Sequence, residues 1–180
     1  MHLTYRPATA GDIEACLAML PPAFTCPPAV WAAFPQTWRR WQADGVMQMT
    51  VLEDGHRPPP TRRIAFGSGV FVSDAFVAEA KSGGEPPQSA RAIREWQAGR
   101  APSASPVLGL EAVRAANSGP GLNLLILHVG WREDLPAEEA RWAKGKLLEA
   151  LLSTYGGYRL REINEAPDGA SPEVSEGQTG

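Results

Sequence analysis

Residues 122–163, LNLLILHVGWREDLPAEEARWAKGKLLEALLSTYGGYRLREI, decide the fold because they hold a strand, a long helix and a second strand in succession. Leu122–Val129 is the most hydrophobic segment of the chain, and an unbroken apolar run of this length is typical of a central strand covered on both faces. After a short turn, Pro136 opens a helix that extends to about Tyr155. Tyr158–Ile163 then has the pattern of a further strand.

The long helix has the apolar spacing of a helix that packs on a sheet. Its apolar residues recur every three or four positions and form one stripe: Ala140, Ala143, Leu147, Leu148, Leu151, Leu152 and Tyr155. Glu138 and Glu139 lie in its first turn, where the helix dipole favours negative charge. The helix is expected to end at Gly156 and Gly157. This half of the chain therefore predicts an α/β arrangement.

The N-terminal segment predicts a short strand followed by a helix. Residues 3–7 alternate between apolar and polar side chains, which is the period of a strand. Thr9 and Asp12 then have the spacing of a capping box, which predicts a helix over residues 10–20.

The next segment predicts a second helix and an antiparallel hairpin. The helix is expected over residues 28–42, where Pro35 allows a kink or two shorter pieces, and Gly45 ends it. One face of this helix collects Val30, Trp31, Phe34, Trp38 and Trp41. Val46–Glu53 and Arg63–Val72 form the expected hairpin, and two alternating glycines in the second strand allow a bulge or a close ligand approach.

The remaining segments contribute helices without a core of their own. Residues 74–119 contain short helical stretches, one of them over residues 89–98, between loops rich in Gly and Pro. They have too few large apolar residues for a separate core, so we interpret them as a helical insertion in one domain that spans residues 1–163. Residues 164–180 are rich in Pro, Gly, Ser and Glu, and we expect them to be disordered.

Composition excludes several classes of function. The net charge is -3 and no basic block is present, so we expect no direct binding of nucleic acid by this chain. No apolar run is long enough to cross a membrane, and the N-terminus lacks the apolar segment of a signal peptide, so we expect a cytoplasmic protein. Cys16 and Cys26 have neither the number of a disulfide scaffold nor the spacing of a zinc site, and we expect no metal.

Two segments resemble the Gcn5-related N-acetyltransferase (GNAT) family. Tyr5–Ile13, YRPATAGDI, is similar to the first strand and first turn of that family, and residues 122–163 are similar to its central strand, long helix and following strand. The resemblance covers about half of the chain. It implies an α/β (α+β) fold in which a mixed, mainly antiparallel central sheet is flanked by helices. The family continues with another helix and two strands, so the resemblance also implies an incomplete C-terminal part.

The same resemblance implies an N-acetyltransferase, an acyltransferase that uses acetyl-CoA. The family holds the pyrophosphate on a loop of the type Arg/Gln-x-x-Gly-x-Gly/Ala, where glycines let phosphate approach the backbone at a helix N-terminus. Alignment on the LLEALL stretch places this loop at residues 139–144. Glu139 replaces the first position, while Trp142 and Lys144 replace the glycines. A carboxylate repels pyrophosphate and an indole fills its space, so the loop is degraded.

The resemblance also implies which residues would hold acetyl-CoA. Backbone groups of the strand would hold pantetheine and the following turn would hold phosphate, which makes the implied binding residues Leu127, His128, Val129, Trp131, Arg132 and Arg141. The acceptor would be an amine or another small molecule, a homodimer is left open, and no catalytic residue is assigned. His128 lies at the end of the apolar strand and is interpreted either as a functional group at the sheet edge or as a buried histidine that bonds to backbone.

A second resemblance provides an alternative function. Residues 65–74, AFGSGVFVSD, and residues 116–128, ANSGPGLNLLILH, resemble the N-terminal half of bacterial LuxR-type transcription regulators, in which a GNAT-like domain precedes a helix-turn-helix. The present sequence contains no helix-turn-helix. This resemblance implies a non-catalytic sensory or regulatory domain. A third reading is a shortened gene product that folds only in part.

Overall fold

The computed structural model describes residues 2–20, 28–82 and 106–165. Strands and helices alternate along these ranges much as the sequence predicts. In chain order the elements are β1 (Leu3–Pro7), the 3-10 helix η1 (Ala10–Asp12), α1 (Ile13–Leu17), α2 (Pro28–Ala43), β2 (Met47–Asp54), β3 (Arg63–Val72), α3 (Asp74–Ser82), α5 (Leu110–Asn117), β4 (Leu122–Trp131), α6 (Ala137–Thr154) and β5 (Leu160–Glu165).

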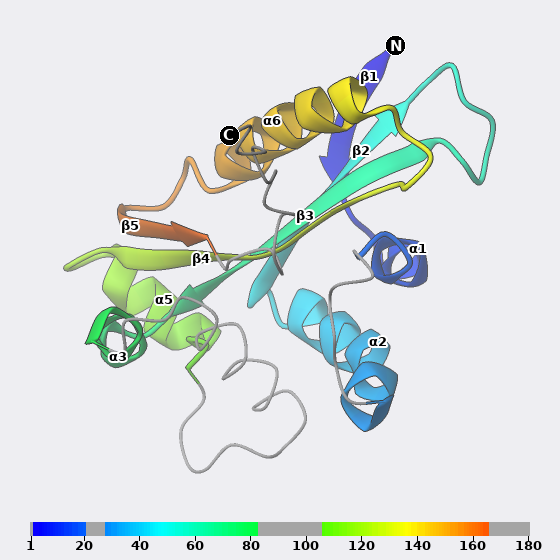
Figure 1. Ribbon diagram of the computed structural model, residues 1–180. Coiled ribbons are helices and arrows are strands. Elements are labelled where there is room, and N and C mark those ends of the chain that lie inside the picture. The colour runs from blue at the N-terminus through cyan, green and yellow to red at the C-terminus, as the bar shows by residue number, and fades with distance from the viewer. Residues whose placement is uncertain (1, 21–27, 83–105, 166–180) are drawn as a thin grey trace, which may run out of the picture.

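The described strands form one sheet in the order β1-β2-β3-β4-β5. The first three pairings are antiparallel, and β4 pairs with β5 in parallel. The sheet is therefore mixed and mainly antiparallel, which confirms the predicted fold class. Helix α6 provides the crossover between the two parallel strands and covers one face, whereas α1 and α2 cover the other (Figure 1).

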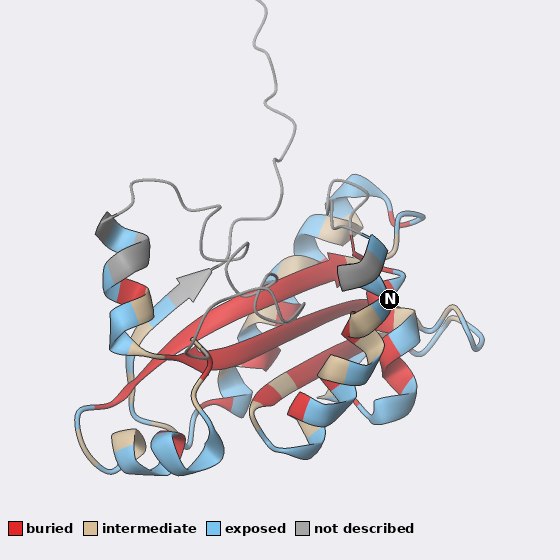
Figure 2. Ribbon diagram, turned by 90° about the horizontal axis from the view of Figure 1, so that it is seen from below, coloured by how far each residue is buried: buried red, intermediate tan, exposed pale blue. Residues whose placement is uncertain are grey.

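Two apolar layers bury the sheet from opposite sides. On the α2 side, Phe34, Trp38 and Trp41 pack with alternate residues of the strands. On the α6 side, Leu147 and Leu151 pack with the intervening residues. The long strands β3 and β4 are consequently buried over most of their length (Figure 2). Burial on both faces thus explains the unbroken apolar run of β4, as the sequence predicted.

Helix α2 is one uninterrupted helix through Pro35, not a pair of shorter pieces. Proline removes a single backbone hydrogen bond, and the burial of the aromatic face outweighs that loss. Trp31 departs from the predicted face, because it is 39% exposed. The helix ends as expected at Gly45, which has a φ of 68°, and the amide of Val46 donates to the carbonyl of Trp41 at 2.9 Å.

The glycines of β3 make room for α6. A Cβ atom at Gly67 would lie 3.2 Å from Leu151, and one at Gly69 would lie 2.7 Å from the hydroxyl of Tyr155. The expected bulge is present, because the register with β4 shifts between Ser68 and Gly69. The structure adds a second reason for the glycines, which is the close packing of α6. Because these two residues have no side chain, the helix can pack close to the sheet.

The segment predicted as an insertion packs on the main core through α3 and α5. Val77 joins the layer on the α2 side, and Val113 joins the layer on the α6 side. The helix predicted over residues 89–98 lies outside the described residues. Strand β5 extends to Glu165, two residues beyond the predicted strand, and the rest of the C-terminal segment lies outside the described residues. No helix in the described ranges is both long and apolar enough to cross a membrane.

An ionic cluster joins the first strand to the centre of the sheet. Asp12 is 1% exposed and accepts hydrogen bonds from Arg6 at 2.8 and 3.0 Å and from Nε of Arg63 at 2.6 Å. The amide of Thr9 also donates to this carboxylate at 2.8 Å, which is one half of the predicted capping box. The hydrogen bonds from Arg6 hold the pKa of Asp12 well below its usual range, although burial opposes them.

We expect Asp12→Asn to lower the free energy of unfolding at pH 7 by about 2 kcal/mol, less than for a fully buried pair because both arginines are part-exposed. A carboxyl group whose pKa is lower in the folded than in the unfolded protein contributes its full stability at pH values above its pKa in the unfolded chain. For an aspartate in the unfolded chain this pKa is about 3.9. The difference between the two proteins should therefore be constant at neutral pH and should shrink below about pH 4. Urea unfolding from pH 7 to pH 3 measures it, and a difference that grows on acidification would contradict the ionic cluster.

Candidate functional site

The register of β4 shifts by one residue at its middle. Ser68 of β3 faces His128, but the next residue, Gly69, faces Ile126, so Leu127 is the extra residue of a β-bulge. Side chains normally alternate along a strand, and the bulge breaks this alternation. Leu127 belongs to the layer on the α2 side, and the His128 ring lies on the same side.

The described pairing of β4 with β5 reaches the residue before the bulge. The last pair is Ile126 with Glu165, and within the described residues no strand pairs with the segment Leu127–Trp131 on that side. Backbone N–H and C=O groups therefore point alternately from an open strand edge. Such an edge can form main-chain hydrogen bonds with an extended ligand that carries amide groups.

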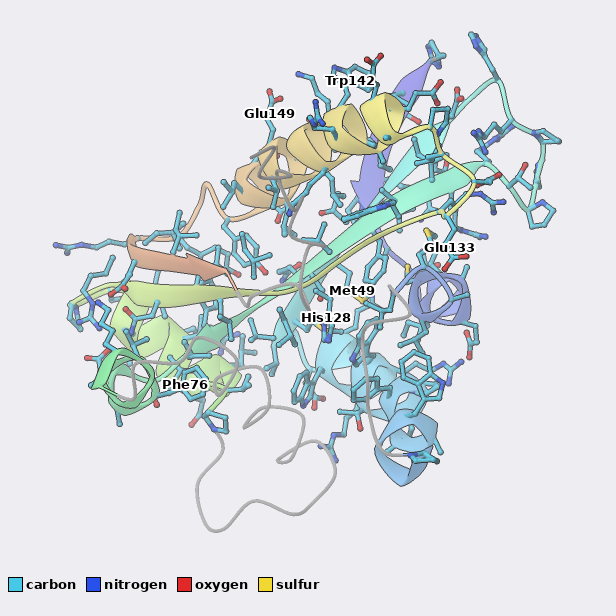
Figure 3. The ribbon with its side chains drawn as sticks, in the orientation of Figure 1. Met49, Phe76, His128, Glu133, Trp142 and Glu149 are labelled. Carbon is cyan, nitrogen blue, oxygen red and sulfur yellow. The ribbon has the colours of Figure 1, made fainter. Side chains whose placement is uncertain are left out.

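His128 is held inside the layer on the α2 side. It is 5% exposed, and its Nδ1 lies 3.3 Å from Oγ of Ser68, which is itself buried. The ring centroids of Trp38 and Phe34 lie 4.9 and 6.3 Å from that of the histidine (Figure 3). His128 is thus a buried histidine, and the contact of its Nδ1 is with a side-chain hydroxyl. Sequence reasoning missed Ser68, because only the register of two distant strands brings it to the histidine.

The first turn of α6 offers few free backbone donors. The amide of Ala140 donates to the carbonyl of Pro136 at 2.9 Å, which leaves the amides before it without partners inside the helix. The stretch 139–144, where the family loop was expected, lies within α6, so the amides after Ala140 are used by helical hydrogen bonds. Glu138 and Glu139 lie in this first turn. An anion at this helix end would meet a favourable dipole and two unfavourable carboxylates.

The side chains of this part of α6 do not all face the strand. Trp142 is 47% exposed and points away from the sheet, so it does not fill the space beside β4 (Figure 3). Arg141 is also exposed, whereas Ala143 is buried. Lys144 lies with its Nζ 6.0 Å from the ring centroid of Trp131.

The predicted binding residues therefore divide into three places. Leu127, His128 and Val129 surround the bulge, and Trp131 joins Val129 on the α6 side. Arg132 begins the turn after β4, and Arg141 lies apart on the exposed face of α6. Their role in binding acetyl-CoA stays a prediction.

A groove of about 410 Å³ lies beyond the end of β4. Its walls come from α1, the start of β3 and the turn 132–134. Nε of Arg132 donates to Asp134 at 2.8 Å, and Arg57 donates to the same carboxylate at 3.2 Å. The hydrogen bond from Arg132 is the largest cause that lowers the pKa of Asp134, and the hydrogen bond from Arg57 lowers it further. The sequence did not single out this groove, because its walls come from three separate segments.

Comparison with known proteins shows likeness in structure but none in sequence. No protein-family model and no curated protein matches the chain. A predicted acetyltransferase from Clostridium acetobutylicum, crystallised with acetyl-CoA, matches 92% of this chain and 81% of its own with a TM-score of 0.53 at 12% identity.

Two further solved structures match with lower scores. A transcriptional regulator from Bacillus halodurans covers 93% of this chain and 83% of its own, with a TM-score of 0.49 at 13% identity. A GCN5-related N-acetyltransferase from Ralstonia eutropha covers 98% of this chain and 97% of its own, with a TM-score of 0.48 at 16% identity. Together with the order of the strands and helices, the likeness to the Clostridium protein shows that the chain has a GNAT-like fold, as the sequence predicted.

Two glycines near the site provide a matched pair of substitutions. A Cβ atom at Gly130 would lie 2.4 Å from Phe66 and 2.7 Å from the carbonyl oxygen of Met19, whereas one at Gly145 would meet nothing within 4 Å. We expect Gly130→Ala to destabilise the protein by about 1–3 kcal/mol through overpacking. Gly145→Ala should stabilise it by about 0.5–1 kcal/mol, because alanine favours an exposed helix interior. Urea unfolding of both variants measures this, and an unchanged Gly130→Ala protein would mean that Met19 does not pack on β4.

Proposed function

We propose that this GNAT-like domain binds acetyl-CoA along the open edge of β4 and transfers the acetyl group to an amine. The observation that carries the proposal is the bulge at Leu127, after which β4 has no strand partner on the β5 side among the described residues. Pantetheine is an extended chain with two amide groups, so it can bind to Leu127–Trp131 as a further strand would. The likeness to a predicted acetyltransferase that was crystallised with acetyl-CoA supports the proposal.

The residues at the phosphate end fit the ligand only in part. The first amides of α6 and its dipole favour a phosphate group, while the carboxylates of Glu138 and Glu139 oppose it. No glycine lies in the first two turns of the helix to let phosphate approach the backbone. The proposal therefore places most of the affinity in the strand edge and expects weaker binding than a glycine-rich loop would provide.

The residues around the bulge can assist acetyl transfer. Bound acetyl-CoA supplies an activated thioester, on which attack by a neutral amine forms a C–N bond, breaks the C–S bond and releases the amine proton. A backbone N–H group at the edge of Leu127–Val129 donates a hydrogen bond to the thioester carbonyl oxygen, where negative charge develops. The imidazole of His128, which lies on the α2 side of this segment, accepts the proton. The thiol sulfur that leaves takes up a proton in turn.

A specific observation also favours a second function. The two carboxylates in the first turn of α6 are unsuited to a tightly held pyrophosphate. A non-catalytic domain that senses a small ligand, related to bacterial transcription regulators, needs no such loop. In that case the edge of β4 would bind a ligand without chemistry.

Isothermal titration with acetyl-CoA tests the first function. We expect saturable binding, and we expect Glu138→Gln and Glu139→Gln each to tighten it by a factor of roughly two to five, because each removes a repulsion of about 0.3–1 kcal/mol. Glu111→Gln is the matched control, since Glu111 lies in the first turn of α5. The Glu111→Gln protein should bind acetyl-CoA with the same affinity as the unaltered protein.

The same titration separates the two functions. Binding with acetyl transfer to an amine, lost in His128→Gln while binding persists, supports the enzyme. No binding by any of the four proteins would rule out an acetyl-CoA site and leave the sensory function. Equal affinity in all of them would show that the phosphates do not lie at the α6 N-terminus.

A further inference from the structure

The groove beyond β4 contains hydrogen-bond donors that no protein group uses. Nε of Arg63 donates to buried Asp12, but the terminal nitrogens of this guanidinium make no hydrogen bond in the described structure. The side chain of Arg63 is 30% exposed, so these donors are only partly covered. A planar guanidinium with its fork of N–H groups free is suited to a carboxylate.

The groove also contains one carboxylate without a counter-charge. Glu133 lines it and forms no ion pair or hydrogen bond in the described structure, and Figure 3 shows it at the turn that follows β4. The other carboxylates nearby are compensated. Asp12 is paired with Arg6 and Arg63, and Asp134 is paired with arginines on two sides.

We propose that this groove binds a zwitterionic amino acid, whose carboxylate meets Arg63 and whose ammonium group meets Glu133. The free donors and the free acceptor thus each receive the group of opposite charge. Ala15, Ala18 and Met19 form an apolar wall, so a ligand with an aliphatic side chain fits better than a bare zwitterion. The volume of about 410 Å³ lies in the range of small-ligand sites.

The groove is a second site, separate from the edge of β4. The backbone of Met19 packs on Gly130, where an added Cβ would come within 2.7 Å of the Met19 carbonyl oxygen. The lining of the groove includes none of the residues 127–131. A ligand in the groove touches the turn that leads into α6, so its occupancy can influence the neighbouring site without competing for it. The inference therefore stands or falls independently of acetyl-CoA binding.

Titration with three matched compounds tests the proposal. L-leucine carries both charges, L-leucinamide lacks the carboxylate and N-acetyl-L-leucine lacks the ammonium group. Binding is followed by the NMR shifts of the Ala15 and Ala18 methyl groups, with and without acetyl-CoA. L-leucine should bind at least about fivefold more tightly than either analogue, because each analogue loses one charged contact. Its affinity should not fall through competition when acetyl-CoA saturates the protein.

Two variants assign the contacts. The Glu133→Gln protein should no longer prefer L-leucine over N-acetyl-L-leucine, but it should still prefer L-leucine over L-leucinamide. The control Glu111→Gln should keep both preferences. Arg63→Lys keeps a positive charge beside Asp12 and should reduce the preference over L-leucinamide; its thermal unfolding shows whether the fold is kept. Equal binding of all three compounds, no saturation by L-leucine, an unchanged Glu133→Gln protein or displacement by acetyl-CoA would each overturn the proposal.

Discussion

One extra residue in β4 determines how the centre of this protein is arranged. Because Leu127 has no counterpart in β3, the strand changes its twist and its side-chain alternation at that point. The described pairing with β5 reaches the residue before it, and His128 comes to the same side as Leu127. The position of the imidazole on the α2 side and its contact with Ser68 therefore share a single cause. A β4 without the bulge would place the His128 side chain on the α6 side and remove that contact.

Close packing fixes the surroundings of the bulge. Glycines on β3 let α6 approach the sheet, and Gly130 lets Met19 approach β4 from the opposite side. The ionic cluster around Asp12 ties β1 and the start of β3 to α1, and Met19 lies in the turn that follows this helix. The end of β4 is thus held from both faces, while on the β5 side no strand of the described ranges pairs with it. Rigid support of an open edge is what a ligand-binding strand requires.

Local sequence patterns predicted the elements, whereas long-range register was needed for the site. The apolar run of β4, the stripe of α6 and the Thr9–Asp12 spacing each depend on residues close in sequence, and each was confirmed. The glycines of β3 allowed a bulge, but nothing in LNLLILHV marks which residue of β4 lacks a partner on β3. The exposure of Trp31 and the pairing of Ser68 with His128 likewise depend on segments distant in sequence. The resemblance to the GNAT family pointed to this strand, and which of its residues have strand partners needed the structure.

Among the described residues, β4 is paired on both sides up to Ile126 and on one side after it. Amide hydrogen exchange resolved by residue measures this directly. Every amide from Asn123 to Ile126 should be strongly protected, whereas protected and fast-exchanging amides should alternate from Leu127 to Trp131, and acetyl-CoA should slow the fast ones. Continuous protection from Leu122 to Trp131 in the free protein would contradict the open edge.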